Sequence, residues 1–356
     1  MGLISTPDGY RMPAEWEPHE ATWIAWPHYR ADWPGKFAPI PWVFGEVVRH
    51  LHRHERVRIL VENGRLEHRA RRLLSQAGVS WASVEIHGGA TTRGGRRDSG
   101  RICVGGGGAG QGGMGILDWK FNGWARYSNW RRDDAVPAAI ARLLGLKCRQ
   151  PEMEPGGRRI VLEGGGIDVN GRGTLVATEE CLLSPVQARN PGASRAEMEG
   201  ILRHCLGVSK VIWLGRGIAG DDTHGHVDDI ARFVDPTTLV VSVESNRRDA
   251  NYETLGENRR RLAEATDQDG RPFRVVELPM PRPLFFRGER LPASYANFYI
   301  ANRTVLVPTF NDPNDPLALR RLSRLFPERS VVGIHSLDLV WGLGTLHCLT
   351  LQQPLA

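Results

Sequence analysis

The sequence lacks the features of membrane-bound, secreted and disulfide-bonded proteins. No run within its 356 residues approaches the roughly 20 consecutive apolar residues that a membrane-spanning helix needs. The first residues do not show a basic start followed by an apolar centre, the pattern of a secretory signal. The five cysteines form no CxxC pair, which argues against a disulfide framework and a structural zinc site. We therefore expect a soluble, cytoplasmic protein with reduced cysteines.

Long basic runs and linkers of the Ser/Pro/Gly type are also absent. The net charge is +6 and the pI is about 9.3, and basic proteins gain affinity for nucleic acid by releasing counterions from phosphates. Here, however, the basic residues form short clusters close to acidic residues, at Arg96-Arg97, Arg131-Arg132 and Arg259 to Arg261. We interpret these clusters as solvated faces and expect no nucleic-acid partner. The length suits one large domain or two ordinary ones.

Apolar stretches of β type alternate with helical stretches along the whole chain, which is typical of an α/β protein. We predict strands at 57–61, 159–162, 175–178, 210–214, 238–243, 273–278, 304–308 and 330–334. We predict helices at 41–55, 65–77, 135–144, 194–206, 252–265 and 316–326. A hairpin is expected in GIDVNGRGTLVAT, because two strand-like runs flank Asn170-Gly171, a pair that favours a type I′ turn.

A glycine-rich tract from Gly105 to Gly115 contains the spacing GxGxxG at Gly108, Gly110 and Gly113. In dinucleotide-binding proteins this spacing joins a strand to a helix, whereas here the segment LDWKFNGW follows. We therefore interpret the tract as a mobile loop and expect no dinucleotide.

The C-terminal stretch LVWGLGTLHCLTLQQP points to Cys348 as a nucleophile. Gly342 and Gly344 allow a ligand to approach the backbone closely beside the thiol, and LHCLTL has the pattern of a short strand. In a strand, the adjacent His347 would point to the opposite face, so the thiol needs a histidine from elsewhere. The alternative is that Cys348 is a small buried hydrophobe, the usual state of a free cysteine.

The segment GDDTHGHVDDIARFV supplies a candidate histidine. If HVD is extended, His226 and Asp228 face the same side and can address one ligand. Two alternatives stay open. His224, His226, Asp228 and Asp229 could bind a divalent metal, since HxH and HxD spacings are common in metallohydrolases. The same residues could instead only cap and solubilise a turn.

Two further acids are followed closely by glycine, as expected for a pocket. Asp98 lies in RRDSG before an apolar strand, and Glu163 lies in RRIVLEGGGIDV before three glycines. The simpler interpretations are an ordinary turn aspartate and a solvated strand end.

The order of these segments resembles a known family. The stretches DGYRMPAEWEPHEATWIAWP, RDSG, DWKFNGW, LEGGGIDVNGRGT, GHVDDIARF and GTLHCLTLQQP are similar to those of the agmatine deiminase and bacterial peptidylarginine deiminase group within the guanidine-modifying pentein superfamily. The resemblance covers essentially the whole chain and implies a single catalytic domain over residues 1–356. It implies a five-bladed pseudosymmetric α/β propeller with about 70 residues per unit. It also implies that neither a metal nor a cofactor is used, so His224 would not be a metal ligand.

By position in these motifs, the resemblance implies Cys348 as nucleophile, His226 as general acid and base, Asp98 and Asp228 as guanidinium ligands, and Glu163 as the support of His226. A guanidinium is planar, cationic and rich in N–H donors, so two carboxylates can grip it in bidentate fashion. The implied reaction is hydrolytic deimination through a covalent thiouronium, which releases ammonia and a ureido product. Agmatine, giving N-carbamoylputrescine for polyamine synthesis, is the leading candidate for this small cationic substrate. No membrane partner is expected, and a homo-oligomer is left open.

The chain departs from the family pattern near Asp98. Agmatine deiminases carry WMRD, whose tryptophan can pack on the aliphatic chain of the substrate, but this sequence has Gly95 in GGRRDSG and GRICV in place of GPTF. His224 stands where many relatives have aspartate. Arg126 in GWARY either meets a substrate carboxylate or is an ordinary surface arginine. Alternatives therefore include a free or peptidyl arginine substrate, a metal-dependent guanidine hydrolase, a non-catalytic guanidine-binding protein and an amidinotransferase.

Overall fold

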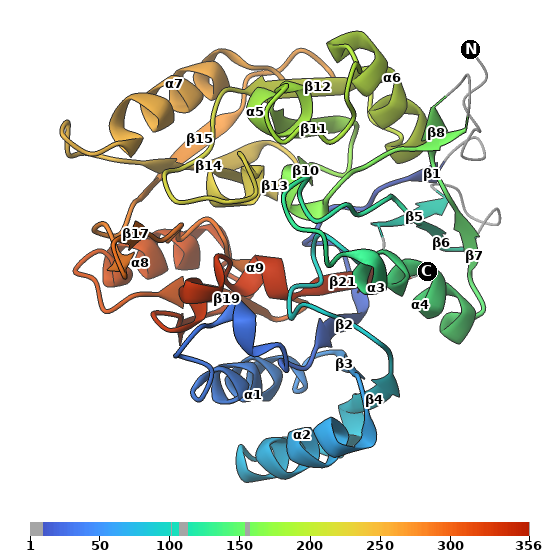
Figure 1. Ribbon diagram of the computed structural model, residues 1–356. Helices are drawn as coiled ribbons and strands as arrows, with labels where there is room; N and C mark the ends of the chain where they lie inside the picture. The colour runs from blue at the N-terminus through green and yellow to red at the C-terminus, as the bar shows by residue number, and fades with distance from the viewer. Residues whose placement is uncertain (1–9, 101, 107–112, 154–156, 356) are drawn as a thin grey trace.

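The computed structural model describes residues 10–100, 102–106, 113–153 and 157–355. It shows an α/β fold with the longer helices around the outside (Figure 1). The mobile loop expected in the glycine tract falls mainly on residues 107–112, which lie outside the described residues. Every helix in the described part of the chain is too short or too polar to span a lipid bilayer.

Five sheets of the described chain share one arrangement of strands. In each sheet two strands pair antiparallel, and a third strand pairs in parallel with the second. A parallel pair needs a crossover connection, and in each of these units at least one helix supplies it. The chain therefore repeats a strand–strand–helix–strand unit.

Four of these units are continuous in the chain. The first contains β5 (Ile102–Gly106), β6 (Gly115–Leu117), α3 (Arg131–Asp134), α4 (Val136–Leu144) and β7 (Lys147–Arg149). The second contains β10 (Ile167–Val169), β11 (Thr174–Thr178), α5 (Glu179–Leu183), α6 (Arg195–Leu206) and β12 (Lys210–Leu214). The third contains β13 (Ala231–Asp235), β14 (Thr238–Val243), α7 (Asn251–Glu264) and β15 (Arg274–Pro279). The fourth contains β18 (Tyr299–Ile300), β19 (Thr304–Thr309), α8 (Asp315–Leu325) and β20 (Ser330–His335).

The fifth unit joins the two ends of the chain. Its antiparallel pair is β21 (Leu351–Pro354) with β2 (His19–Ala25), in register at Trp23 and Leu351. It continues through α1 (Ile40–Leu51), β3 (Arg56–Val61), α2 (Gly64–Gln76) and β4 (Val84–Gly88). The remaining short elements are β1 (Tyr10–Arg11), β8 (Glu152–Met153), β9 (Arg158–Arg159), β16 (Phe285–Phe286), β17 (Glu289–Arg290) and α9 (Leu346–Leu349).

The predicted helices are confirmed, and their ends differ by at most one residue except that α1 ends at Leu51 instead of residue 55. Local signals explain this accuracy. Helix α6, for example, begins with a capping box in which Ser194 and Glu197 satisfy each other's backbone N–H groups. It ends at Gly207, whose φ of 66° closes the helix in the left-handed region.

The strand predicted at 159–162 is wrong, because β9 ends at Arg159 and the next three residues do not continue it. Ile160, Val161 and Leu162 are apolar because they are buried, the first and last of them in a hydrophobic cluster, and Val161 makes one isolated bridge to Lys120. A buried loop segment has the same apolar pattern as a short strand. The other predicted strands are confirmed within one residue at each end.

The hairpin is confirmed as β10 and β11, but its predicted type I′ turn is wrong. Gly171 has a φ of 68°, whereas Asn170 is not among the residues with positive φ. The Asn170 side chain instead accepts hydrogen bonds from the backbone N–H groups of Arg172 and Thr174. This side chain holds a longer loop between the strands.

Two segments that we expected to be extended are helical turns. Cys348 lies in α9 and not in a strand, and His226 precedes a 3₁₀ turn at Val227–Asp229. The cause at α9 is tertiary, because the side-chain oxygen of Asn297 accepts hydrogen bonds from the Thr345 hydroxyl and the His347 N–H at 2.7 and 3.1 Å.

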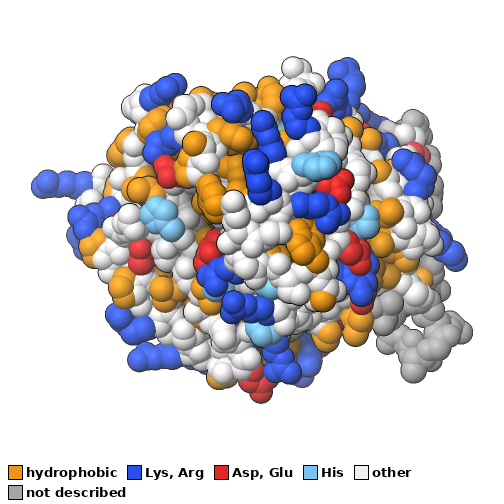
Figure 2. Space-filling model, turned by 90° about the horizontal axis from the view of Figure 1, so that it is seen from below, with side chains coloured by type: hydrophobic (Ala, Val, Ile, Leu, Met, Phe, Trp, Pro, Cys, Tyr) orange, Lys and Arg blue, Asp and Glu red, His pale blue; other side chains and the backbone are white. Residues whose placement is uncertain are grey.

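The basic clusters differ in environment. Arg96 and Arg97 are buried and pair with Asp133 and Glu15 at 2.9 and 2.8 Å, so their interpretation as a solvated face is wrong. Arg131 is exposed, as expected. On the face shown in Figure 2, Lys and Arg side chains are dispersed among acidic and hydrophobic ones.

Candidate active site

A pocket of about 240 Å³ opens beside Cys348. Ionisable and aromatic side chains share its lining: Cys348, Asp98, Asp32, Asp222 and Arg93, with Trp33, Phe121, Trp124 and Tyr127. Apolar walls with a few convergent polar groups are typical of small-molecule sites. The volume suits a small ligand.

Cys348 lies in α9, which is near the middle of the view in Figure 1. The amide of Asn297 donates to its sulfur at 3.2 Å, and Asp228 Oδ2 lies 3.7 Å from the same sulfur. Burial, followed by the nearby acids Asp228, Asp229 and Asp98, raises the pKa of the thiol well above its usual value. Burial among these acids therefore disfavours the thiolate, and a cation in the site would favour it.

The glycine turn Gly164–Gly166 brings three functional groups together around bare backbone. A Cβ at Gly165 would lie 2.6 Å from His226 Nδ1, 2.8 Å from Asp98 Oδ1 and 3.0 Å from Asp228 Oδ2. The Gly165 N–H donates to Asp98 Oδ1 at 2.9 Å. Only a residue without a Cβ leaves the space in which these groups face one another.

The two ring nitrogens of His226 face different acids. Nδ1 lies 3.7 Å from Asp98 Oδ1, and Nε2 lies 3.7 Å from Glu163 Oε2. The imidazole is 1% exposed, and neither nitrogen has a hydrogen-bond partner within the described residues. Burial alone would lower the pKa of His226, but Asp98, Cys181 and Glu163 together raise it well above its usual value. The surroundings of His226 therefore favour the protonated imidazole beside Asp98.

Glu163 is fixed by a buried ion pair. Arg189 Nε lies 3.0 and 3.2 Å from its two carboxylate oxygens, and both side chains are 0% exposed. Burial would raise the pKa of Glu163, but Arg189 and His226 lower it. Arg189 also donates to the carbonyl of Thr223, close to His226 in the chain. An ionised Glu163 therefore favours a positive charge on His226.

Asp228 belongs to a buried ionic network. His347 Nδ1 lies 2.7 Å from Asp228 Oδ2, and its Nε2 lies 2.9 Å from Glu15, which pairs with Arg97 and Arg232 at 2.8 Å each. Burial would raise the pKa of Asp228, but the hydrogen bond from His347 holds it below its usual value. Asp228 Oδ1 is buried without a partner in the described residues, so it is free to accept an N–H from a ligand.

Asp98 is held by an aromatic residue of the pocket wall. Trp124 Nε1 donates to Asp98 Oδ2 at 3.0 Å, and its ring packs edge-to-face on Phe121 and Tyr127. Burial raises the pKa of Asp98, with His226 opposing the shift. A cation beside Asp98 would favour the ionised carboxylate.

The wall near Gly95 contains a cation of the protein itself. A Cβ at Gly95 would lie 3.2 Å from the carbonyl oxygen of Cys348. Nearby in the lining, the Arg93 guanidinium lies 4.4 and 5.0 Å from the ring centroids of Tyr127 and Trp124. Asn129 and Asp32 also hold Arg93, at 2.9 and 3.4 Å.

The structure thus gathers the five expected site residues in one region. Cys348 and Asp98 line the pocket, Asp228 lies against the thiol, and His226 and Glu163 follow behind Asp98. Their catalytic roles stay predictions.

Comparison with known proteins identifies the family. Residues 11–354 match the family described as Porphyromonas-type peptidyl-arginine deiminase. The chain belongs to this family. An agmatine deiminase of Pseudomonas aeruginosa (strain LESB58) is 36% identical over 376 residues, covering 98% of this chain and 97% of that protein.

Solved structures agree with this membership of the Porphyromonas-type family. The agmatine deiminase of Enterococcus faecalis has a TM-score of 0.88 at 31% identity, with 98% of each chain covered. A cysteine-to-serine variant of the C. jejuni agmatine deiminase with substrate bound has a TM-score of 0.84 at 27% identity, covering 97% of this chain and 96% of that one.

Two other residues singled out in this member of the Porphyromonas-type family lie apart from the pocket lining. His224 Nε2 lies 3.1 Å from the Ser184 hydroxyl. Arg126 is exposed and is not among the lining residues, and its guanidinium lies 5.7 Å from the ring centroid of Tyr127.

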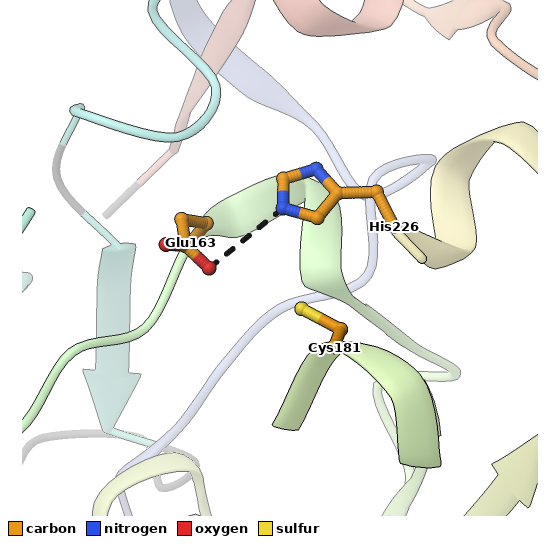
Figure 3. Close-up of side chains that lie close together, drawn as sticks. All are labelled: Glu163, Cys181 and His226. Carbon is orange, nitrogen blue, oxygen red and sulfur yellow. Dashed lines mark ion pairs between the residues drawn. The ribbon is translucent and has the colours of Figure 1, made fainter. Parts of the chain in front are cut away.

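The metal set considered from the sequence, His224 with His226, Asp228 and Asp229, does not form a cluster of ligand atoms among the described residues. A different group could hold a metal in this deiminase-family chain: Glu163, Cys181 and His226, whose ligand atoms lie within 4.8 Å of one another (Figure 3).

Several residues that contribute to the site were not expected from the sequence, among them Asn297, His347, Trp124, Cys181, Glu15 and Arg189. Trp124 and Glu15 occur inside the motifs DWKFNGW and PAEWEPHE, which offered a signal. Asn297 has no motif of its own. His347 was rejected as the partner of the Cys348 thiol, because neighbouring side chains in a strand point to opposite faces. In the structure it lies in a helical turn and its ring contacts Asp228.

Proposed function

We propose that this chain is an agmatine deiminase, a cysteine-dependent hydrolase that converts agmatine and water into N-carbamoylputrescine and ammonia. The convergence of the Cys348 thiol, the Asp98 and Asp228 carboxylates and a protonated His226 around one pocket carries the proposal. Relatives from P. aeruginosa and E. faecalis that bear this name cover nearly the whole chain.

Binding begins with the guanidinium between Asp98 and Asp228. The free Oδ1 of Asp228 accepts an N–H on one side, and Asp98, held by Trp124 and the Gly165 N–H, accepts on the other. Charge-assisted hydrogen bonds to two carboxylates fix the plane of the cation. Because Asp228 Oδ2 is 3.7 Å from the sulfur, this position presents the central carbon to Cys348.

The substrate activates the nucleophile. Without a ligand, burial and the surrounding acids raise the pKa of Cys348 well above its usual value. A bound guanidinium neutralises those acids, and the Asn297 amide hydrogen bond stabilises the thiolate. Each tenfold gain in thiolate at fixed pH corresponds to about 1.4 kcal/mol.

His226 then serves first as acid and later as base. The thiolate attacks the guanidinium carbon, His226 donates a proton to the leaving nitrogen, the C–N bond breaks and ammonia departs. A thiouronium remains on Cys348. A water molecule loses a proton to His226 and attacks the same carbon, and the C–S bond breaks to release the ureido product and the thiolate. Glu163 supports the charged state of His226 throughout.

The pocket also favours a substrate with a second positive charge. Asp222 accepts a hydrogen bond from the Tyr127 hydroxyl at 2.6 Å, and within the described residues no cation forms an ion pair with it. Asp32, in contrast, pairs with Arg93 at 3.4 Å. An ammonium end would compensate Asp222, whereas a substrate carboxylate would add to its charge. The aromatic residues of the lining partly replace the tryptophan that agmatine deiminases carry at the position of Gly95.

We further propose that the five repeated units are the blades of a five-bladed α/β propeller and that residues 1–356 form one catalytic domain. The unit shared by β21 and β2 would close the ring between the chain ends. The described cysteines are free, as a reducing compartment such as the cytoplasm maintains them. Assembly into a homo-oligomer is compatible with this proposal.

The decisive experiment measures ammonia and ureido product from agmatine, free arginine and peptidyl arginine. We expect the highest kcat/KM with agmatine, no sensitivity to EDTA, and loss of turnover in Cys348→Ser. Cys205→Ser, which alters another buried thiol, is the matched control and should stay active. A preference for arginine would refute the substrate but not the reaction. Failure of every guanidino compound with the thiol intact would refute both.

A further inference from the structure

A second cysteine lies on the far side of His226 from the pocket. Cys181, Glu163 and His226 each offer one ligand atom, and these three atoms lie within 4.8 Å of one another. Within this group, His226 Nε2 is 3.7 Å from Glu163 Oε2. Their side chains converge in Figure 3 and are at most 1% exposed. This cluster is separate from the groups that hold the guanidinium, because His226 Nδ1 faces Asp98 while Nε2 faces Glu163.

Local structure holds each member of the cluster in place. Cys181 lies in the first turn of α5, where its N–H donates to the N-cap hydroxyl of Thr178 at 3.0 Å. The same hydroxyl donates to the carbonyl of Gly225 at 2.5 Å, next to His226 in the chain. Arg189 fixes Glu163. The three side chains are therefore held in place, and their ligand atoms, within 4.8 Å of one another, must draw closer together to share one ion.

The ring nitrogen of His226 that faces this cluster lacks a hydrogen-bond partner in the described part of the chain. Nε2 is buried and lacks a hydrogen-bond partner among the described residues, although it faces the other two groups. Gly166 leaves the neighbouring space open, since a Cβ there would lie 3.2 Å from Cys181 Sγ and 3.9 Å from His226 Nε2. A buried imidazole nitrogen normally has a partner, and a bound ion would supply one.

We propose that Glu163, Cys181 and His226 form an inhibitory Zn²⁺ site. One thiolate, one imidazole and one carboxylate are the ligand types that zinc takes in tetrahedral sites, with water in the fourth position. The sulfur ligand disfavours Mg²⁺ and Ca²⁺, which prefer oxygen. On binding, Zn²⁺ displaces two protons to solvent, one from the Cys181 thiol and one from Nε2 of the His226 imidazolium, and the thiolate and Glu163 together balance its two charges.

The inhibition follows from the positions of the two ring nitrogens of His226, with Nδ1 beside Asp98 and Nε2 in the zinc site. It rests on the acid–base role of His226 in the proposed function. With Zn²⁺ on Nε2, His226 carries at most one proton and no longer cycles through the imidazolium form. Asp98 and Asp228 are not ligands, so agmatine still binds. Zinc should therefore lower kcat and leave KM unchanged. Zinc bound at the Cys348 thiol would instead compete with substrate.

The experiment uses the full chain after treatment with a chelator and buffer exchange. Initial rates are measured with agmatine at increasing ZnCl₂, for wild type, Cys181→Ala, Cys181→Ser and the control Cys205→Ala. We expect non-competitive inhibition of wild type and of Cys205→Ala that EDTA reverses. Removing an outer-shell partner lowers metal affinity by up to about 100-fold. Because Cys181 is a direct ligand, its loss in an active variant should raise the zinc concentration needed for inhibition by about 100-fold. The serine variant serves if alanine destabilises the fold.

A direct measurement of zinc binding tests the zinc site independently of the proposed enzymatic activity. Cys348→Ser protein is titrated with ZnCl₂ against a chromogenic chelator, which needs no activity. One zinc per chain in Cys348→Ser, lost in the Cys348→Ser/Cys181→Ser double variant, supports the site. Equal zinc binding by these two variants, or competitive inhibition that Cys181 substitutions leave unchanged, overturns it. If zinc binds as expected while no guanidino compound reacts, the site stands and the proposed function fails.

Discussion

The buried ion pair between Glu163 and Arg189 allows one catalytic prediction to be developed in full. Glu163→Gln keeps the size of the side chain and removes its charge. Both partners are 0% exposed, and Arg189 Nε contacts both carboxylate oxygens. Leaving a buried charge without its partner costs about 3–5 kcal/mol. For 356 residues the entropy of unfolding is about 0.75 kcal/mol per kelvin, so Tm should fall by about 4–7 °C.

The same substitution should change the pH dependence of the reaction. Burial lowers the pKa of His226, and Asp98 and Glu163 are among the groups that raise it. Without the charge of Glu163, the pKa of His226 falls, and His226 loses its proton at lower pH. The alkaline limb of kcat/KM, measured by ammonia release, should therefore move to lower pH. At a pH above the shifted limb, kcat should fall about 100-fold, the lower end of the effect of general acid catalysis.

A matched control distinguishes catalysis from folding. Asp249→Asn disrupts another largely buried pair, with Arg290 at 2.9 Å, that contributes nothing to the pocket lining. It should lower Tm and leave the pH profile in place. If Glu163→Gln lowers Tm but keeps both kcat and the alkaline limb of wild type, Glu163 has only a structural role and the reasoning is refuted.

Three further predictions concern the pocket. Gly165→Ala should abolish turnover, because the new Cβ would lie 2.6 Å from His226 Nδ1, and the overpacking should cost about 1–3 kcal/mol of stability; normal agmatine kinetics would contradict this. Burial raises the pKa of Asp32 to about 6, with Arg93 opposing, so the acid becomes neutral below that pH and leaves Arg93 uncompensated. KM for agmatine should rise as pH falls through 6, and Asp32→Asn should show a raised KM that no longer depends on pH in this range; a wild-type pH dependence in the variant would refute the assignment. The Asn297 side chain donates to the catalytic thiol, so Asn297→Ala should further raise the pKa of that thiol and slow its alkylation by iodoacetamide at neutral pH, whereas an unchanged alkylation rate would exclude this contact.

Most secondary structure could be predicted because its signals are local. The capping box at Ser194 and the left-handed Gly207 mark the ends of α6 within the sequence itself. The alternation of helices and strands likewise indicates an α/β protein. The segment 160–162 failed because an apolar run records burial, and burial occurs in loops as well as in strands.

The nature of the site was predictable to a smaller extent. Cys348, His226, Asp98, Asp228 and Glu163 were identified through motifs, and the structure gathers them. Their local conformations were not predictable, since α9 depends on hydrogen bonds to a side chain 50 residues away. The strand geometry used to set His347 aside was therefore wrong.

The sequence by itself determined the residue types, the alternation of helices and strands, and the motifs that place the chain in a deiminase family. The tertiary structure alone decided which partner each group received. His347 and Glu15 stand behind Asp228, Arg189 fixes Glu163, and Cys181 faces the far nitrogen of His226. The physical reason is that charge, burial and ligand geometry depend on distances between segments far apart in the chain, and no local pattern records those distances.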